Sequence, residues 1–584
     1  MINNEKVVLG LNIMHPDASA CLYIGDKLVG AVAQERLGKR VKHDLSFPTD
    51  CIKYLLELSK ISVKDIDIVA VARDPKANRF GKLKSLISSK RDVKQAITSY
   101  FTRLKESSNL LTDIASLIGI KGDKNNYEII FVEHHLAHLS ASFFTSPFSM
   151  SAGFSFDGSG DGVSIAYATC EDTRIDIIER QFLPASLGHF YTAMCQLIGF
   201  KGFGEEYKVM GLAPYGSASY VSEMSKIIWV DSSGKLSLDP RYFRVGKAYE
   251  EISLSETGEL KMGNLYTDEL TKLLGIETEL DSKNISQEAK NIARSTQVIF
   301  ENISLELINK LSKVVRTPNL CLAGGCSLNG VLNAKITDAT SFKNTHHHPA
   351  SSDDGNAVGA ALYVRHVVLQ QKRNLSFFSP YTGPEFSDVD VLRAIEALKL
   401  PYDLAVDEVD LIERAAKQIA DGDVIAWYQG RSEWGPRALG NRSILANPKH
   451  PNMKDIINSK IKKREGFRPF APSVLESEVG RLFEKDIKSP YMMHVVQFKK
   501  QFRELFPSVV HIDGTGRIQT VSEELNCLYY NLIKKVKEHT GFGIVLNTSF
   551  NENEPVVTTP EEAIACFVRT EIDSIYLGKY VIHK

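Results

Sequence analysis

The stretch from Glu133 to Gly162 constrains the fold most, because a histidine-rich helix start precedes an apolar strand that ends in an acidic, glycine-dense turn. His134 and His138 stand four positions apart and would share one face of a helix, as metal-binding histidine pairs do. The strand at 152–156 would deliver Asp157 into the turn, where a carboxylate could join two imidazoles and glycine N–H groups could face a phosphate. Two interpretations stay open: a metal site, or a histidine-rich helix followed by an ordinary hairpin.

The length and composition predict an ordinary multidomain globular protein. A chain of 584 residues exceeds what one hydrophobic core usually serves, so two or more domains are expected. Lys and Arg number 70 against 71 Asp and Glu, which leaves no basic excess for a nucleic-acid backbone. The cysteines form no C-x-x-C pair, which argues against a zinc ribbon or a disulfide framework and favours a reducing compartment.

Two further features of the sequence bear on location. The residues after Met1 do not resemble a signal peptide, and no stretch approaches the run of about 20 apolar residues that a membrane helix needs. We therefore expect a cytoplasmic protein with no nucleic-acid and no membrane partner.

Apolar runs in the first half alternate with helical patterns, as in a mixed α/β fold. Residues 7–12, 18–23 and 28–33 predict three antiparallel strands, and the turn between the first two presents His15 and Asp17. Lys42 lies in a basic stretch that alone indicates only a solvated face. Further elements are predicted as helices at 47–61, 76–118 and 286–315 and as strands at 66–72, 163–170, 174–182 and 319–323.

Glycine and acidic residues mark the ends of later elements. The strand at 319–323 turns through Gly324 and Gly325 into a helix, and N–H groups at such a helix start can bind a phosphate. Asp353 also precedes a predicted helix. The run 346–348 consists of three histidines and is interpreted as a solvated loop, because consecutive residues do not share a face.

A stretch with proline and glycine divides the chain. The break in periodicity predicts a linker over 371–400, with a first domain over 1–370 and a second over 401–584. The second domain is long enough for its own core, and its strands are predicted at 424–428, 491–498 and 544–546.

The second domain carries basic residues within stretches of glycine, proline and aromatic residues, unlike the lysine tract of a flexible tail. They are Arg431, Arg437, Arg442, Lys462, Lys463, Arg464, Arg468 and Arg517. Guanidinium groups suit phosphate and carboxylate, so a multiply charged anion such as a polyphosphate is the predicted ligand. The alternative is a set of surface arginines paired with Glu433, Glu465 and Glu476.

A series of short motifs, in one order over nearly the full length, is more specific than any of them alone. They are the turn with His15 and Asp17 and the stretches 133–138, 156–158, 208–216, 324–329, 435–443, 467–472 and 547–551. With these motifs the chain resembles the O-carbamoyltransferase family that includes tobramycin, cephalosporin and nodulation-factor carbamoyltransferases. It departs from that family at Pro16, which separates His15 from Asp17 where the family usually has the two adjacent.

The resemblance implies an α/β (α+β) protein of two domains and a reaction in two steps. The first domain would be actin-like and ribonuclease-H-like, as in threonylcarbamoyl-transfer proteins, and the second would resemble YrdC-type domains. The second domain would make carbamoyl-adenylate from carbamoyl phosphate and ATP, releasing pyrophosphate and phosphate. The first would transfer the carbamoyl group to a hydroxyl of a small natural product or sugar, releasing AMP.

The resemblance also assigns residues to roles. His15, Lys42, Lys462 and Arg468 would be catalytic, and His134, His138, Asp157 and Asp353 would hold a divalent metal. The carbamoyl-phosphate and ATP site would comprise Arg437, Lys462, Arg468, Met492, Arg517, Asn547 and Ser549. The adenylate in the transfer site would contact Gly158, Gly324, Gly325, Ser327 and Asn329.

The family suggests iron(II) as the metal, while the ligand types also permit manganese or zinc. ATP would be a cosubstrate, with Mg²⁺ accompanying it, and a homodimer is possible. One alternative function is a fused tRNA threonylcarbamoyladenosine-type enzyme, from which the balanced charge and the segment 435–440 point away. Another is a non-catalytic nucleotide-binding scaffold, which four candidate metal ligands and a separate cationic site disfavour.

Overall fold

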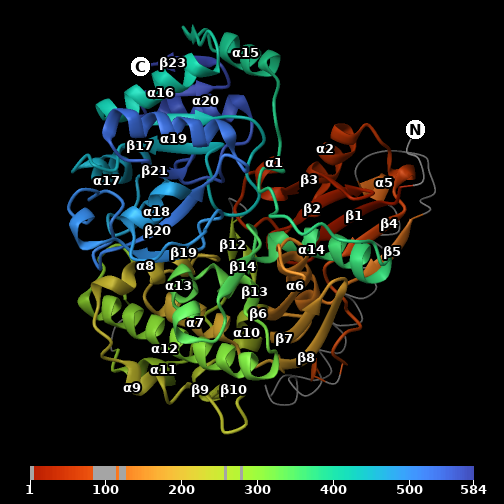
Figure 1. The fold of residues 1–584 in the computed structure, drawn as a ribbon. Coiled ribbons are helices and arrows are strands. Elements are labelled where there is room, and N and C mark those ends of the chain that lie inside the picture. Colours follow the sequence, from red (N-terminus) through yellow and green to blue (C-terminus); the bar gives the residue numbers. More distant parts are fainter. Residues whose placement is uncertain (1–4, 80, 83–113, 118–126, 256–258, 277–279) are drawn as a thin grey trace. The chain divides into compact units, whose positions relative to one another are not determined.

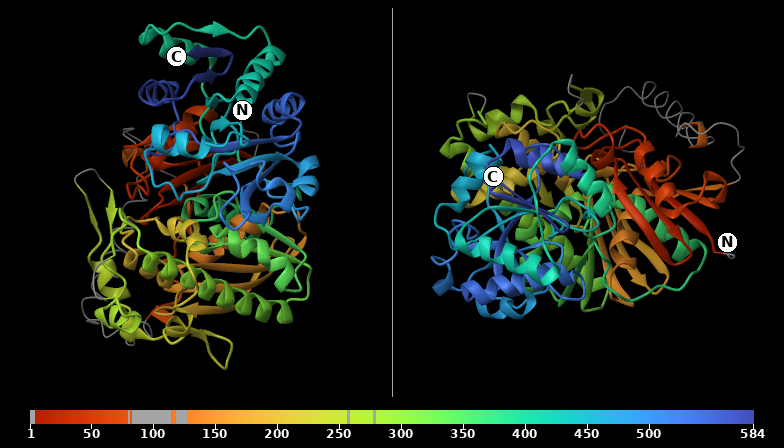
Figure 2. Two further views of the ribbon diagram at one scale, coloured as in Figure 1. Left: turned by 90° about the vertical axis from the view of Figure 1, so that its left-hand side faces the viewer. Right: turned by 90° about the horizontal axis from the view of Figure 1, so that it is seen from above.

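The computed structural model describes residues 5–79, 81–82, 114–117, 127–255, 259–276 and 280–584, so most of the helix predicted over 76–118 lies outside the described residues. The chain forms two compact units (Figures 1 and 2). Unit 1 comprises Met1–Leu328 and Lys335–Phe378, and unit 2 comprises Asn329–Ala334 and Ser379–Lys584. Both units combine helices with mixed sheets, which confirms the predicted α/β class. Among the described residues, no helix is long and apolar enough to cross a membrane.

The first sheet of unit 1 has the strand order β3-β2-β1-β4-β5. Its first three strands pair antiparallel, and β4 and β5 continue the sheet parallel to β1. The strands are β1 (Val7–Asn12), β2 (Ser19–Ile24), β3 (Lys27–Ala33), β4 (Ile68–Val71) and β5 (Glu128–Phe131). Helix α2 (Thr49–Ser59) packs Ile52 and Leu55 into the core beside this sheet.

The second sheet of unit 1 repeats that order as β14-β13-β6-β7-β8. Again three sequential strands pair antiparallel and two later strands extend the sheet in parallel. The strands are β6 (Met150–Gly160), β7 (Val163–Glu171), β8 (Arg174–Phe182), β13 (Asn319–Ala323) and β14 (Asn344–His347). The same strand order therefore occurs twice in unit 1, and the more specific actin-like, ribonuclease-H-like assignment stays a prediction.

The helices that carry or support the site in unit 1 pack against these two sheets (Figure 1). They are α6 (His134–Phe144), α7 (Leu187–Leu197), α8 (Glu206–Leu212), α12 (Gln287–Val314) and α14 (Asn356–Tyr363). Smaller elements are α1 (Gln34–Leu37), α5 (Ile114–Leu117), α9 (Val221–Met224), β9 (Ile228–Val230), β10 (Leu236–Leu238), α10 (Val245–Glu250), β11 (Ser253–Leu254), β12 (Leu260–Lys261) and α11 (Asp268–Leu274). Helix α13 (Gly330–Ala339) begins in unit 2 and ends in unit 1.

The run of histidines at 346–348 is not a solvated loop, as the sequence suggested. His346 and His347 belong to β14, and His348 is 1% exposed. His346 Nε2 and His348 Nδ1 each lie 3.3 Å from Thr145 Oγ1, near the end of α6. Imidazoles can be buried when polar partners are available, and the sequence pattern does not display those partners.

Unit 2 is built on a nine-stranded mixed sheet of order β15-β23-β22-β16-β17-β21-β18-β20-β19. The strands are β15 (Asp403–Leu404), β16 (Ile425–Tyr428), β17 (Arg442–Ala446), β18 (Ala471–Leu475), β19 (His494–Gln497), β20 (Thr515–Val521), β21 (Ile544–Ser549), β22 (Ser574–Leu577) and β23 (Tyr580–His583). Its helices are α15 (Asp388–Ala397), α16 (Glu408–Asp421), α17 (Met453–Ile456), α18 (Glu476–Leu482), α19 (Cys527–Thr540) and α20 (Pro560–Arg569). The more specific YrdC-like assignment stays a prediction.

Part of the predicted linker over 371–400 is a packed helix of unit 2. Ser387 accepts a hydrogen bond from the Asp390 amide and begins α15 as a capping box. The helix buries Val391, Ala394 and Ile395 in the core of unit 2. The predicted linker extends too far because a segment with proline and glycine precedes the helix. The helix itself has the apolar spacing of 3–4 residues that is typical of an amphipathic helix.

Candidate functional site

The first turn of α6 is held in place by two carboxylates. Glu133 accepts a hydrogen bond from the Leu136 amide at 2.9 Å and so caps the helix N-terminus. Asp161 Oδ2 accepts hydrogen bonds from the amides of His134 at 3.1 Å and Asp74 at 2.9 Å. These bonds fix the start of the helix that presents His134 and His138 on successive turns.

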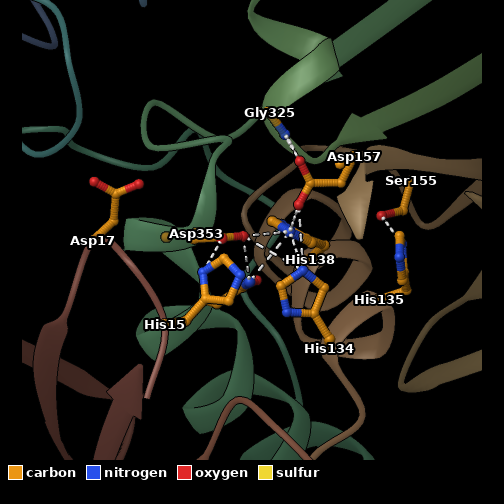
Figure 3. A network of polar contacts seen from close by, with 12 residues as sticks. His15, Asp17, His134, His135, His138, Ser155, Asp157, Gly325 and Asp353 are labelled. Carbon is orange, nitrogen blue, oxygen red and sulfur yellow. Dashed lines mark hydrogen bonds and ion pairs between the residues drawn. The ribbon is translucent and has the colours of Figure 1, made fainter. Parts of the chain in front are cut away.

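The structure brings together the four residues predicted as metal ligands, from three elements of unit 1 (Figure 3). Strand β6 supplies Asp157, and Asp353 lies in the turn just before α14. One ligand atom from each of the four residues lies within 4.8 Å of the other three. His134 Nε2 lies 3.1 Å from His138 Nε2 and 3.3 Å from Asp157 Oδ2, and His138 Nε2 lies 3.2 Å from Asp353 Oδ1.

The spacing and the chemistry of these atoms fit a divalent metal ion. Nitrogen and oxygen ligands about 2.0–2.2 Å from one ion stand about 3–3.6 Å from their neighbours around it. The contacts between His134, His138, Asp157 and Asp353 fall between 3.1 and 3.4 Å. Two imidazole nitrogens that face one another are poor hydrogen-bond partners unless one is protonated, but both can direct lone pairs to an ion.

The electrostatics of the cluster keep its carboxylates ionised. Burial alone would raise the pKa of Asp157, but its contacts with His134 and His138 hold that pKa well below the usual value. Burial alone would lower the pKa of His138, but Asp157 and Asp353 raise it to about 9. A metal ion would replace the protons in this role, because ligands bind in their deprotonated forms.

His15 extends the cluster, whereas Asp17 from the same turn does not reach it (Figure 3). The His15 ring forms a close ion pair with Asp353 through Nδ1. Asp17 Oδ1 instead lies 2.7 Å from Nδ1 of His43. Sequence analysis missed His43, because a histidine at the end of a basic stretch carries no signal of a partner 26 residues earlier. Lys42, beside it, is exposed.

The glycine loop after β13 is linked to the cluster through its backbone. Gly325 donates its N–H to Asp157 Oδ1 at 3.2 Å (Figure 3). Gly324 has φ +88°, and a Cβ there would lie 2.2 Å from the Phe156 carbonyl oxygen, so only glycine fits. Ser327 is buried in the turn that follows, with its amide donating to Gly324. The loop therefore brings backbone N–H groups beside the candidate metal ligands.

Two other residues predicted to contact the adenylate have different surroundings. Gly158 follows Asp157, and a Cβ there would lie 3.6 Å from the His189 ring. Burial lowers the pKa of His189 to about 4, so this ring is neutral at pH 7. Asn329 belongs to unit 2 with residues 330–334, so it is separated from Ser327 by the division between the units.

In unit 2, the buried Lys462 donates hydrogen bonds to neutral oxygen atoms. Its Nζ donates to the carbonyl and side-chain oxygens of Asn551 at 2.7 Å, and also to the Ser549 carbonyl. Burial, with Arg464 and Arg468 nearby, holds the Lys462 pKa well below its usual value. The charged form of a lysine in this setting is stabilised when an anion binds beside it.

Arginines gather near this lysine. The pKa of Arg517 lies well below its usual value, mainly because of burial and also because of the positive charges of Arg437, Arg464 and Arg468. The Arg517 Nε atom is buried and has no hydrogen-bond partner among the described residues. Arg464 is oriented by its Nε, which donates to Asn458 Oδ1 at 2.7 Å. Cations pressed together in a buried site favour a multiply charged anion.

Other arginines of the basic set stabilise loops instead. Arg442 is 0% exposed, and its guanidinium donates to the carbonyls of Gln429 at 2.8 Å and Gly430 at 2.9 Å. Arg431 donates to the Gly383 carbonyl at 3.0 Å. Among the alternative surface pairs, the one with Glu433 is wrong, because Glu433 is buried and its Oε1 accepts the amides of Leu439, Asn441 and Arg442. The pair with Glu465 is present, since Arg468 Nη1 lies 3.5 Å from Glu465 Oε2.

The remaining predicted residues lie close to the arginine loop or the lysine. Asn547 Nδ2 donates to the carbonyl of Ala438, next to Arg437, at 3.0 Å. Met492 is buried with φ +60°, a conformation that is costly without glycine and is often found at binding sites. Ser549 contacts Lys462. The structure thus places a cationic group of residues in unit 2 and a His/Asp cluster in unit 1.

Family models identify the class of protein to which this arrangement belongs. The model described as Carbamoyltransferase N-terminus matches residues 7–362, and the model described as Carbamoyltransferase C-terminus matches residues 416–584. The protein is therefore a transferase of carbamoyl groups. It belongs to the carbamoyltransferase family, as the sequence motifs predicted, and the alternative of a non-catalytic scaffold is wrong.

Relatives of similar length support this assignment. The chain is 35% identical to the uncharacterized protein sll1178 of Synechocystis sp., over 99% of this chain and 96% of that protein. It is 35% identical to the Nodulation protein NolNO of Sinorhizobium fredii, over 100% of this chain and 81% of that protein. The Nodulation protein U of the same species is 27% identical over 93% of both chains.

A solved structure of HypF from T. kodakarensis matches with a TM-score of 0.29 at 11% identity. The match covers 63% of this chain and 48% of the HypF chain, so the match spans about half of that protein. A score this low supports no conclusion about function.

Proposed function

We propose that this protein is an ATP-dependent O-carbamoyltransferase that makes carbamoyl-adenylate in unit 2 and transfers the carbamoyl group in unit 1. The acceptor is a hydroxyl group of a small molecule such as a natural product or a sugar. The observation that carries the proposal is the group of four partly buried arginines in unit 2, Arg437, Arg464, Arg468 and Arg517, because neighbouring cations favour a multiply charged anion as substrate.

The first step brings together two anions. Water cleaves carbamoyl phosphate to carbamate and phosphate, and a carbamate oxygen then attacks the α-phosphorus of ATP and displaces pyrophosphate. Arg437, Arg468 and Arg517 would neutralise the phosphate groups, since the approach of two polyanions is prohibitive without cations. Lys462 would donate from Nζ to the same anions in place of part of its carbonyl contacts, and Mg²⁺ would accompany ATP. Met492, Asn547 and Ser549 would complete the binding site.

The second step needs an activated carbonyl and a deprotonated alcohol. The acceptor oxygen attacks the carbamoyl carbon, the bond to the AMP phosphate oxygen breaks, and the alcohol proton leaves with a base. Gly158, Gly324, Gly325 and Ser327 would line the adenylate site in unit 1, and Asn329 is the further residue that the family resemblance assigns to the adenylate. His15 and Lys42 are the candidates to orient the reacting groups.

His134, His138, Asp157 and Asp353 would hold the divalent ion, with iron(II) proposed and manganese or zinc as the other options. When bound, the ion supplies Lewis-acid stabilisation of the leaving phosphate. The residues around it exclude water: His138 is 1% exposed and His134 3% exposed. The ionised carboxylates hold the imidazoles in their orientation whether or not the ion is present.

Separating the two steps tests the proposal. With ATP and carbamoyl phosphate, wild-type protein should release pyrophosphate, and mass spectrometry with a panel of hydroxylated compounds should find a carbamoyl adduct. Arg517→Met should abolish pyrophosphate release by removing a buried cation. It should leave the metal content unchanged, because Arg517 belongs to unit 2. His138→Ala should lose the metal and adduct formation but continue to release pyrophosphate.

Arg431→Met is the matched control, because Arg431 is an arginine of the same domain whose guanidinium donates to the Gly383 carbonyl. It should keep ATP- and carbamoyl-phosphate-dependent pyrophosphate release within a few-fold of wild type. Loss of pyrophosphate release in His138→Ala, or loss of metal in Arg517→Met, would contradict the division of labour. Retention of tRNA at physiological salt, with no adduct on any small hydroxyl compound, would instead favour the threonylcarbamoyl alternative.

A further inference from the structure

Asn356 is a buried polar residue at the candidate metal centre that the predicted ligand set does not include. It is the first residue of α14 and is 0% exposed. Its Nδ2 atom lies 3.2 Å from His138 Nε2 and 3.5 Å from Asp353 Oδ1. These distances resemble the 3.1–3.4 Å separations among the four His and Asp ligand atoms themselves. The end of the amide therefore lies where a further ligand would be.

The other end of the amide is unsatisfied. Asn356 Oδ1 is buried and has no hydrogen-bond partner in the described part of the chain. A buried amide oxygen without a donor is destabilising. Once an ion takes the lone pair of His138 Nε2, the amide NH₂ group also loses this acceptor. With the nitrogen toward the cluster, the amide nitrogen would then lack this acceptor and the amide oxygen would still lack a donor.

Rotation of the amide by half a turn would bring its oxygen, and not its nitrogen, to the cluster. The NH₂ group and the oxygen of an asparagine have nearly the same shape, so the rotation moves no neighbour. It places Oδ1 where Nδ2 lies, beside His138 Nε2 and Asp353 Oδ1. An amide oxygen is a good ligand for hard divalent ions, whereas an amide nitrogen is not.

We propose that Asn356 is an additional metal ligand of unit 1, coordinating through Oδ1. The proposal rests on the metal centre of the proposed function and deepens it. It changes the expected donor set from two nitrogens and two oxygens to two nitrogens and three oxygens. A set of five protein ligands rich in oxygen suits iron(II) or manganese(II) better than the four-coordinate geometry common for zinc.

The packing of α14 explains how an asparagine reaches this position. A Cβ on Gly359 would lie 2.0 Å from the carbonyl oxygen of Ala137, which lies between His134 and His138 in α6. On the opposite side, a Cβ on Gly10 of β1 would lie 2.2 Å from the carbonyl oxygen of Ala357. Glycine on both sides lets α14 approach α6 and β1 closely. Asn356 and Asp353, three residues apart, therefore both contact His138.

Metal binding to the whole protein tests this role without relying on activity. Asn356→Leu removes both amide atoms at similar volume, and Asn356→Asp keeps an oxygen. After metal removal, titration of wild type with iron(II) or manganese(II) should give one site, and Asn356→Leu should bind about tenfold or more weakly. Asn356→Asp should keep an affinity closer to that of wild type. With cobalt(II), visible absorption should be stronger in Asn356→Leu than in wild type, because loss of a ligand lowers the coordination number.

Asn319→Leu is the matched control, because its amide donates to the Met150 carbonyl at 3.0 Å at the end of β13 away from Gly325. Its metal affinity and cobalt spectrum should equal those of wild type. If Asn356→Leu also matches wild type in both, the ligand is refuted while the centre stands. If wild type binds no metal, the centre and the ligand fail together. Circular dichroism shows whether Asn356→Leu is folded. If it is not, Asn356→Asp provides the test, because weak metal binding by a folded Asn356→Asp refutes oxygen ligation.

Discussion

The side chains of His15 and Asp17 lie in the same turn but make contacts with different residues. His15 pairs with Asp353 at the cluster, and Asp17 pairs with His43. Asp17 and His43 have φ values of +66° and +58°, which are costly for residues with side chains. Pro16, where the family usually has none, provides the spacing. Because these backbone conformations are unfavourable locally, we infer that the contact between Asp17 and His43 stabilises them.

The Asp17–His43 pair predicts a pH-dependent stability. Burial alone would lower the pKa of His43, but Asp17, with Glu35 and Glu206 nearby, raises it to about 9. Because the pKa is raised by folding, the contribution is complete below about pH 6.5 and is lost as the pH rises through about 9. Asp17→Asn should lower the free energy of unfolding by roughly 1–2 kcal/mol at pH 6.5 and by almost nothing at pH 10.

Thermal unfolding of wild type and Asp17→Asn from pH 6 to 10 measures this difference. Glu171→Gln, which removes an exposed partner of Arg174, is the control and should show a small difference at every pH in this range. A gap between wild type and Asp17→Asn that stays constant up to pH 10 would show that the pair does not titrate as expected.

Helix α14 helps to set the geometry of the His/Asp cluster, the candidate metal centre. It follows Asp353, begins at Asn356 and packs on α6 through a glycine–carbonyl contact. Interiors are close-packed, so a helix held at this distance cannot move without separating the ligands it carries from those of α6. The cluster is therefore a property of two packed helices and one strand end.

Gly359→Ala should disturb both stability and metal binding. The new Cβ would lie 2.0 Å from the backbone oxygen of Ala137, so α14 must shift away from α6. We expect a loss of about 1–3 kcal/mol in the free energy of unfolding and a lower metal affinity. Chemical denaturation and metal titration measure the two effects.

Gly480→Ala is the helical control for that substitution. A Cβ on Gly480 in α18 would meet its nearest neighbour at 3.4 Å, an ordinary contact, so stability should hold or improve. Unchanged metal affinity in Gly359→Ala would mean that the close approach of the two helices does not set the cluster.

On the scale of the whole molecule, sequence position and structural unit do not coincide. Residues 329–334 lie within the first two-thirds of the chain but belong to unit 2. Asn333 Nδ2 donates to the Met493 carbonyl at 2.9 Å, and the Ala334 carbonyl accepts from Lys485. The chain therefore crosses between the units at both ends of this segment as well as after Phe378.

This crossing predicts that Asn333→Ala affects the first step and spares the metal centre. Loss of the amide leaves the buried Met493 carbonyl without this donor, at a cost of about 1–3 kcal/mol, next to Met492 of the candidate ATP site. Pyrophosphate release should fall several-fold with metal content unchanged. Asn309→Ala, whose amide donates to the Ala339 carbonyl from an exposed position, should change neither. Loss of metal in Asn333→Ala would contradict the assignment of this segment to unit 2.

Local patterns predicted the elements well where hydrophobic periodicity was strong. The long helix predicted at 286–315 is α12, and the three opening strands are β1, β2 and β3. The patterns failed where burial rests on polar contacts. The histidines of 346–348, for example, are buried against Thr145. The linker prediction failed for a different reason, because residues with proline and glycine precede the apolar helix α15. From the sequence pattern alone, a buried polar residue whose partner is distant in the chain cannot be distinguished from a surface residue.

The sequence by itself determined the α/β class, the His134–His138 helical pair and, through its ordered motifs, the carbamoyltransferase family. These follow from spacing and residue type, which are local properties of the chain. Only the tertiary structure decided that Asn356 meets His138, that Asp17 meets His43 and not the cluster, and that Arg442 supports a loop while Arg517 lies near other arginines. Such contacts join residues far apart in the chain, and they form only because packing excludes water and brings whole elements to fixed distances.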